Sequence, residues 1–185
     1  MGTHESAPSR LSKGDKKTLK DHLKGQDLPF LFKVLSVQKA LSIQAHPDLL
    51  LAPKLHLRDP KNYRDSNHKP EMAIALGCFE ALCGFRRAVA IGDFAEKYRG
   101  FGELIGGVEM IQKLHNANFS DEKNVLKESF TKLMNRTSVE ISEALKLMPE
   151  LSSDPSNEEL KLFYRLNAQY PSDIGIFCVF FLNHF

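Results

Sequence analysis

The pattern of apolar and polar residues differs along the chain, and residues 28–85 have the pattern of strands. Three runs in this region are rich in apolar residues: PFLFKVLSV, ALSIQA, and EMAIALGCFEALCGF, which Gly77 interrupts. Such runs, bounded by turn residues, are typical of strands. Four prolines between the second and third runs predict a loop with at most one short helix. Residues 1–27 are polar and irregular, with one weak helical stretch from about Lys16 to Lys24.

From residue 86 to about residue 169 the apolar spacing becomes that of helices. Thr137 and Glu140 form a capping box ahead of an apolar face with i, i+3, i+4, i+7 spacing. Ser156 and Glu159, after an Asp-Pro pair, are a second helix start signal. A further amphipathic helix is expected around residues 125–134. These apolar stripes are typical of helices packed on a core and imply no cofactor.

The last run, SDIGIFCVFFLNHF, returns to strand-like residues. The order of strands, helices and a final strand predicts an α+β fold, in which a sheet domain is interrupted by an all-helical insertion. We place the first part of the sheet domain at residues 1–85, the helical insertion at residues 86–170 and the return strand at residues 171–185.

Charge and composition exclude several classes of protein. The chain has 25 basic and 23 acidic residues, so it lacks the basic excess of a nucleic-acid-binding protein. The most apolar segment, IGIFCVFFLNHF, is too short to span a bilayer, which takes about 20 residues. Cys78, Cys83 and Cys178 form no CxxC pair and are expected to be free, mostly buried thiols in a reducing compartment. We expect neither nucleic acid nor membrane as a partner.

Candidate chemistry lies in the stretch ALSIQAHPD. On a strand, Gln44 and His46 would project to the same face, because side chains alternate with a period of two. Glu71 follows later, directly after a proline. An amide oxygen, an imidazole nitrogen and a carboxylate oxygen can bind a divalent ion such as zinc. The spacing alone leaves a second interpretation open, in which Gln44 and His46 are hydrogen-bonded structural residues.

Longer stretches resemble one family of enzymes. LPFLFKVLSVQKALSIQAHPD, NHKPEMAIAL and ALCGFR, together with MGTHESAPSRL and QYPSDIGIF, are similar to the type I mannose-6-phosphate isomerases (phosphomannose isomerases). The resemblance implies a cupin-type β-barrel (jelly roll) with an inserted helical domain and one Zn²⁺ ion. It also implies a cytoplasmic enzyme, expected to be a monomer, that interconverts mannose 6-phosphate and fructose 6-phosphate. That reaction feeds GDP-mannose synthesis and glycosylation.

The resemblance places Gln44, His46 and Glu71 on three of the family's zinc ligands. Metal identity stays open, since such ligands also accept Mn²⁺ or Co²⁺. The family's fourth ligand is a histidine further along than His184. The resemblance therefore implies a chain shortened at both ends relative to the family, with an incomplete barrel.

The resemblance also places Ser42 and Lys69 in the substrate pocket and His4 on a histidine near the site. Lys69 is expected either to neutralise the sugar phosphate or to shuttle the proton between C1 and C2. Two hypotheses remain for the whole chain. It is a zinc-dependent isomerase, or it is a non-catalytic remnant that acts as a metal-binding or partner-binding module. A cupin acting on another phosphosugar is a third.

Overall fold

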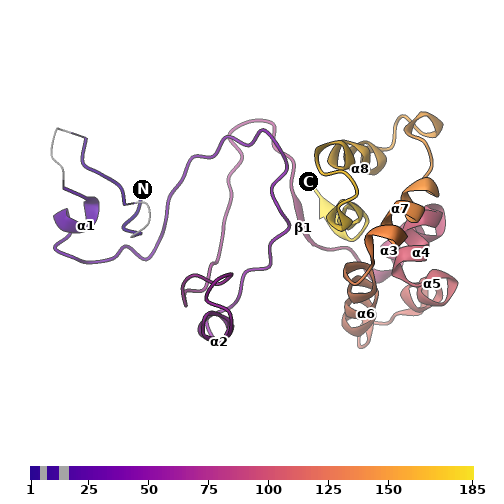
Figure 1. Ribbon diagram of the computed structural model, residues 1–185, viewed down its shortest axis with the longest axis horizontal. Helices are drawn as coiled ribbons and strands as arrows, with labels where there is room; N and C mark the ends of the chain where they lie inside the picture. The colour runs from indigo at the N-terminus through magenta and orange to yellow at the C-terminus, as the bar shows by residue number, and fades with distance from the viewer. Residues whose placement is uncertain (5–7, 13–16) are drawn as a thin grey trace. The chain divides into compact units, whose positions relative to one another are not determined.

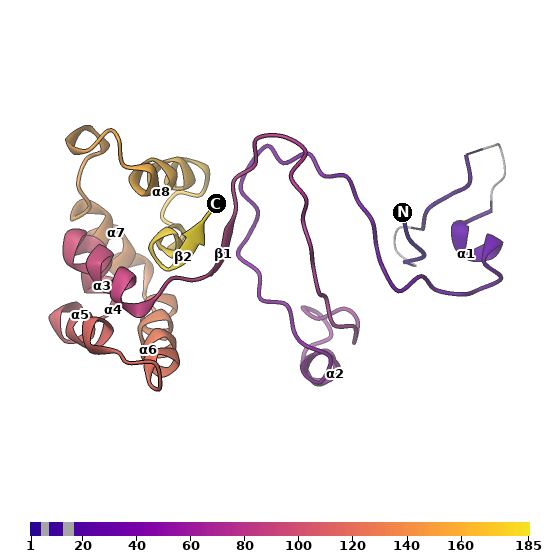
Figure 2. The ribbon, with the colours of Figure 1, turned by 180° about the vertical axis from the view of Figure 1, so that it is seen from behind.

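The computed structural model describes residues 1–4, 8–12 and 17–185. The chain separates into two compact units, residues Met1–Lys39 and Ala40–Phe185. Figures 1 and 2 show helices α3 to α8 (residues 88–169) of the second unit gathered next to the short strands, whereas α2 (Leu51–Arg58) lies apart from them on the extended part of the chain. None of the helices in the described part of the chain is long and apolar enough to cross a membrane.

The first unit is held by hydrogen bonds around one short helix, α1 (Leu19–His22). Thr18 and Asp21 cap this helix reciprocally: the Asp21 amide donates to Thr18 Oγ1, and the Thr18 amide donates to Asp21 Oδ2. The hydroxyl of Thr3 is buried and accepts a hydrogen bond from the Leu28 amide at 3.0 Å. The helical stretch predicted from Lys16 is thus confirmed in part, and Lys16 itself lies outside the described residues.

The predicted strands are mostly absent. Over residues 28–81 the structure has no strand, so the prediction for PFLFKVLSV and ALSIQA is wrong. The third run forms a strand only at its end, β1 (Leu82–Phe85), which pairs antiparallel with β2 (Leu182–His184). In this two-stranded sheet Leu82 lies opposite His184 and Phe85 opposite Leu182. A strand needs a neighbouring strand for its backbone hydrogen bonds, and an apolar pattern does not supply one.

The helices follow the sequence prediction closely. In chain order they are α2 (Leu51–Arg58), α3 (Ala88–Lys97), α4 (Arg99–Ile105), α5 (Gly107–Asn116), α6 (Glu122–Met134), α7 (Ser138–Lys146) and α8 (Glu158–Gln169), with a 3₁₀ turn at η1 (Leu151–Ser153). The capping box that starts α7 is confirmed, with the Thr137 amide 2.8 Å from Glu140 Oε2. Helix α8 is also confirmed, but its cap is Asn157, whose side chain accepts from the Leu160 amide.

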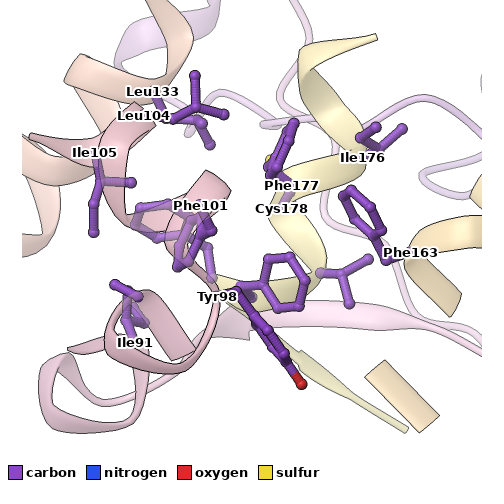
Figure 3. Packing of buried hydrophobic residues seen from close by; sticks show 14 of the residues in the cluster. Ile91, Tyr98, Phe101, Leu104, Ile105, Leu133, Phe163, Ile176, Phe177 and Cys178 are labelled. Atoms are coloured by element: carbon purple, nitrogen blue, oxygen red, sulfur yellow. The ribbon is translucent and has the colours of Figure 1, made fainter. Parts of the chain in front are cut away.

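The core of the second unit is built around a segment predicted as a strand. Most of the last apolar run is a 3₁₀ helix, η2 (Ile174–Phe180), and only its end continues as β2. Phe177, Cys178 and Phe180 are fully buried there, among aromatic residues of the surrounding helices (Figure 3). A segment apolar on all sides can be buried as either a helix or a strand, so the pattern could not decide between them.

The thiols divide between core and surface. Burial raises the pKa of Cys178 to about 12, as expected for a thiol inside the core. Cys78 and Cys83 are exposed, so the expectation of mostly buried thiols is wrong for these two.

Candidate metal and substrate site

The candidate residues of the second unit lie on two extended stretches joined through α2 (Figure 1). Ser42, Gln44 and His46 precede α2, and Lys69 and Glu71 follow it. His46 and Lys69 each stand directly before a proline, which disfavours helical backbone at the residue it follows. The two prolines therefore favour extended backbone at His46 and Lys69, although neither stretch has a partner strand.

His46 and Glu71 are the two candidate ligands that the structure brings together. His46 Nε2 lies 3.2 Å from Glu71 Oε2, across 25 positions of sequence. Zinc bonds of about 2.0–2.2 Å at a tetrahedral angle place two ligand atoms about 3.3 Å apart. The spacing of this pair therefore fits two ligands of one zinc ion, and both side chains retain access to solvent.

Gln44 lies on the same stretch as His46, but its amide nitrogen donates to Ser42 Oγ at 3.3 Å. Among the described residues no hydrogen bond joins Gln44 to the His46–Glu71 pair, and its amide oxygen accepts none. That oxygen is therefore a candidate for a third metal ligand. Across residues 1–4, 8–12 and 17–185, no three His, Cys, Asp or Glu side chains gather as metal ligands. A metal ion at the His46–Glu71 pair would therefore need Gln44 or water to complete its ligands.

Lys69 has a partner that the sequence prediction missed. Its amine lies 3.4 Å from Asp65 Oδ2, and the structure records no ion pair between Lys69 and Glu71 in the described part of the chain. The Asn67 amide donates to the Asp65 carboxylate, and this bond, with the nearby Lys69 charge, lowers the pKa of Asp65. Asp65 is thus ionised near neutral pH and holds the Lys69 amine. The i, i+4 spacing predicts such a contact on a helix, but residues 65–69 are not helical, so the sequence held no signal for this pair.

His4, the remaining predicted residue, lies elsewhere in the chain. His4 is exposed and belongs to the first unit, and its role near the site stays a prediction. His184, which the sequence does not assign to the site, lies at the end of β2 with its Nε2 atom 3.4 Å from Glu80, and it forms no ion pair with Glu71 among the described residues.

Comparison with protein families assigns both halves of the chain. Residues 1–88 match the family model for the catalytic domain of type I phosphomannose isomerase, and residues 105–182 match the model for its helical insertion domain. The chain belongs to the type I phosphomannose isomerase family. All six candidate residues lie within the part matched to the phosphomannose isomerase catalytic domain. A helical insertion, predicted from the sequence, is confirmed, whereas the predicted domain boundaries stay a prediction.

Named relatives agree with the family. The chain is 41% identical to the mannose-6-phosphate isomerase of Ogataea parapolymorpha over 210 residues, covering all of this chain and 49% of the relative. It is 43% identical to the mannose-6-phosphate isomerase of Rattus norvegicus, covering 96% of this chain and 43% of the relative. For mannose-6-phosphate isomerase 2 of Arabidopsis thaliana the identity is 39%, covering all of this chain and 48% of the relative. The chain spans about half the length of the curated relatives it matches.

Proposed function

We propose that this chain is a metal-dependent isomerase that interconverts mannose 6-phosphate and fructose 6-phosphate. The observation that carries the proposal is the His46–Glu71 pair, a zinc-compatible ligand pair inside the part matched to the family's catalytic domain. The names of the relatives support the proposed substrate, since all three described above are mannose-6-phosphate isomerases.

The metal would be a single Zn²⁺ ion held by Gln44, His46 and Glu71. When bound, zinc would act as a Lewis acid toward the sugar oxygens on which negative charge develops. His46 supplies its Nε2 atom and Glu71 its Oε2 atom, the two atoms that already lie 3.2 Å apart. Gln44 supplies its amide oxygen, which accepts no hydrogen bond from any described residue.

The isomerisation moves a proton between C1 and C2 of the open-chain sugar. Lys69 carries its positive charge at Nζ beside Asp65, and this supports a role in binding the phosphate. In its neutral form, the same amine would instead take the proton from one carbon as a base and return it to the other. Ser42 would donate a hydrogen bond from its hydroxyl to a sugar oxygen.

We further propose that the extended stretches belong to a cupin-type barrel. Their strand-like apolar residues are exposed, as expected of side chains that further strands would cover. The most exposed are Leu76 (88%), Met72 (87%), Ile74 (77%) and Leu41 (66%). The proposed setting is the cytoplasm, as a monomer, in supply of GDP-mannose for glycosylation.

The test is a coupled assay of fructose 6-phosphate formation by the purified 185-residue chain, with zinc added or chelated. We expect zinc-dependent turnover that His46→Ala lowers by at least about 100-fold, since it removes a ligand. His68→Ala is the matched control, because His68 is exposed, lies three residues before Glu71 and, in the described part of the chain, forms no hydrogen bond or ion pair with His46 or Glu71. Equal losses in the two variants would contradict the assignment of His46.

The second candidate is a non-catalytic metal-binding or partner-binding module. It is favoured by the contrast between a helical part with its own core and ligand-bearing stretches that lack strand partners among the described residues. A folded chain that binds zinc through His46 but converts no mannose 6-phosphate would support this candidate. It would contradict the isomerase proposal for the chain alone.

A further inference from the structure

The ligand-bearing stretch is held at one point by the helical part of the same unit. The Ala40 amide donates to Gln169 Oε1 at 3.1 Å, and the Tyr170 hydroxyl donates to the Ala40 carbonyl. Both polar backbone groups of Ala40 are thus engaged, by two consecutive residues about 130 positions along the chain. Together these two side chains form what we call the Ala40 clamp.

A second contact follows three residues later. The Cδ1 methyl of Ile43 lies beside Gly175, near the start of η2. A Cβ placed on Gly175 would be 3.5 Å from this methyl. The turn that joins clamp and glycine is itself hydrogen-bonded: the Ser172 amide donates to Asn167 Oδ1 at 3.1 Å, and the Gly175 amide donates to Asp173 Oδ1 at 2.7 Å. The helical part therefore presents a stiff edge to residues 40–43.

The clamp residues are anchored to the core. Gln169 is the last residue of α8 and Tyr170 is its C-cap. The inner face of α8 is buried, with Phe163 fully inaccessible and packed on Phe177 of η2 at a ring-centroid distance of 5.1 Å. The clamp thus ties an exposed stretch to a helix whose inner face packs in the buried core.

The position of the clamp matters for the candidate ligands. On extended backbone, side chains at positions i, i+2, i+4 and i+6 share one face. Counted from Ala40, these positions are Ser42, Gln44 and His46. The clamp fixes the backbone at the start of this stretch, and the Ile43 contact holds it three residues further on, between Ser42 and Gln44.

We propose that Gln169 and Tyr170 are positioning residues that hold the metal-binding and substrate-binding side chains of the stretch 40–46 in register. This inference rests on the proposed function for the identity of the ligands. The helical insertion then contributes to the site without touching metal or substrate, by lowering the entropy that Gln44 and His46 lose on binding.

The test uses the full chain and compares two tyrosines of the same region. Tyr170→Phe removes the clamp hydroxyl. Tyr164→Phe is the matched control, because the Tyr164 hydroxyl also donates to a backbone carbonyl, that of Pro149, away from the stretch. Gln169→Leu removes the second half of the clamp, whereas Gln169→Glu keeps an acceptor oxygen and serves as the rescue. Co²⁺ alone is the metal probe, followed by its visible absorption.

The first readout is the amide order parameters of residues 40–46 in metal-free protein. We expect Tyr170→Phe and Gln169→Leu to lower them from rigid values of about 0.85 toward values below about 0.6, with Tyr164→Phe and Gln169→Glu near wild type. The second readout is Co²⁺ affinity, expected to fall about threefold to tenfold in the same two variants.

Equal order parameters in Tyr170→Phe and Tyr164→Phe overturn the clamp, as does an equal loss of Co²⁺ affinity in both. If wild-type protein gives no Co²⁺ spectrum that depends on His46, the proposed metal site fails instead. The order parameters then decide the clamp alone: lower values in the clamp variants than in the control uphold it, and no difference overturns it.

Discussion

Two regions of one unit are both rich in apolar residues but differ in whether those residues are buried. They are the extended region, residues 40–81, and the helical region, residues 86–182. In the helical region Phe101, Phe177 and Phe180 are completely buried, whereas in the extended region Leu76 and Met72 are almost fully exposed. A helix satisfies its backbone hydrogen bonds within itself, so it needs only a surface against which to pack. An extended segment needs a neighbouring strand before it can bury anything. Apolar content alone therefore does not make a core.

The sharpest test of this contrast replaces one phenylalanine in each region. Phe180 is fully buried, with ring centroids 4.9 Å from Tyr98 and 5.0 Å from Phe101. We expect Phe180→Ala to lower the free energy of unfolding by about 3–5 kcal/mol, because it leaves a cavity in the aromatic core. Urea denaturation followed by far-UV circular dichroism measures the change.

The control is Phe79→Ala, since Phe79 is 53% exposed in the extended region. Its effect should stay within about 0.5 kcal/mol, as for surface substitutions. Similar losses in the two variants would show that the extended region is buried in solution.

A smaller effect is expected from a pair of glycines. A Cβ on Gly100 in α4 would lie 2.2 Å from the carbonyl oxygen of Ala144 in α7, so the two helices would have to move apart. Gly100→Ala should cost about 1–3 kcal/mol through this overpacking, measured by thermal and urea denaturation. A Cβ on Gly77 would meet no atom within 4 Å. Gly77→Ala should be neutral or slightly stabilising, and a large cost there would contradict the open environment of the extended region.

The smallest effect concerns pH and the start of α7. Hydrogen bonds from the Thr137 amide and hydroxyl, and then the Arg136 guanidinium, lower the pKa of Glu140 from 4.5 to about 2. Because the folded-state pKa is the lower one, this stabilisation is present above about pH 4.5 and is lost as the pH falls toward about 2. Denaturation at several pH values in this window should show a shallower acid loss for Glu140→Gln.

Glu143→Gln is the control for this slope. Glu143 lies on the same helix and pairs with Lys146 at the surface, outside the capping box. The Glu143→Gln substitution should not reproduce the shallower acid loss of stability expected for Glu140→Gln. An identical change in both variants would argue against the capping box as the cause.

Local signals predicted the helical region well. The Thr137–Glu140 capping box and the amphipathic face of α6 depend on residues three to seven positions apart, so the sequence holds the whole interaction. The apolar run at Ile174–Phe180 was predicted as a strand because its residues have no polar face. The α-helices against which this run packs as a 3₁₀ helix come from residues far away in the sequence.

The candidate site was predictable in part for the same reason. The pattern and the family resemblance pointed to Gln44, His46 and Glu71, and the structure brings His46 and Glu71 within 3.2 Å. The ion pair of Lys69 with Asp65 was missed, because an i, i+4 spacing predicts a contact only on a helix and residues 65–69 are not helical. The contacts of Ala40 with Gln169 and Tyr170 had no local signal, because they join residues about 130 positions apart.

By itself, the sequence determined the helices, the family and the residue types available as ligands, since each depends on short stretches or on whole-chain similarity. Only the tertiary structure decided which apolar runs are buried, that the last run is helical and that the end of α8 contacts Ala40, at the start of the stretch with the candidate ligands. The physical reason is that burial and backbone pairing depend on which distant segments meet, and no local pattern states that.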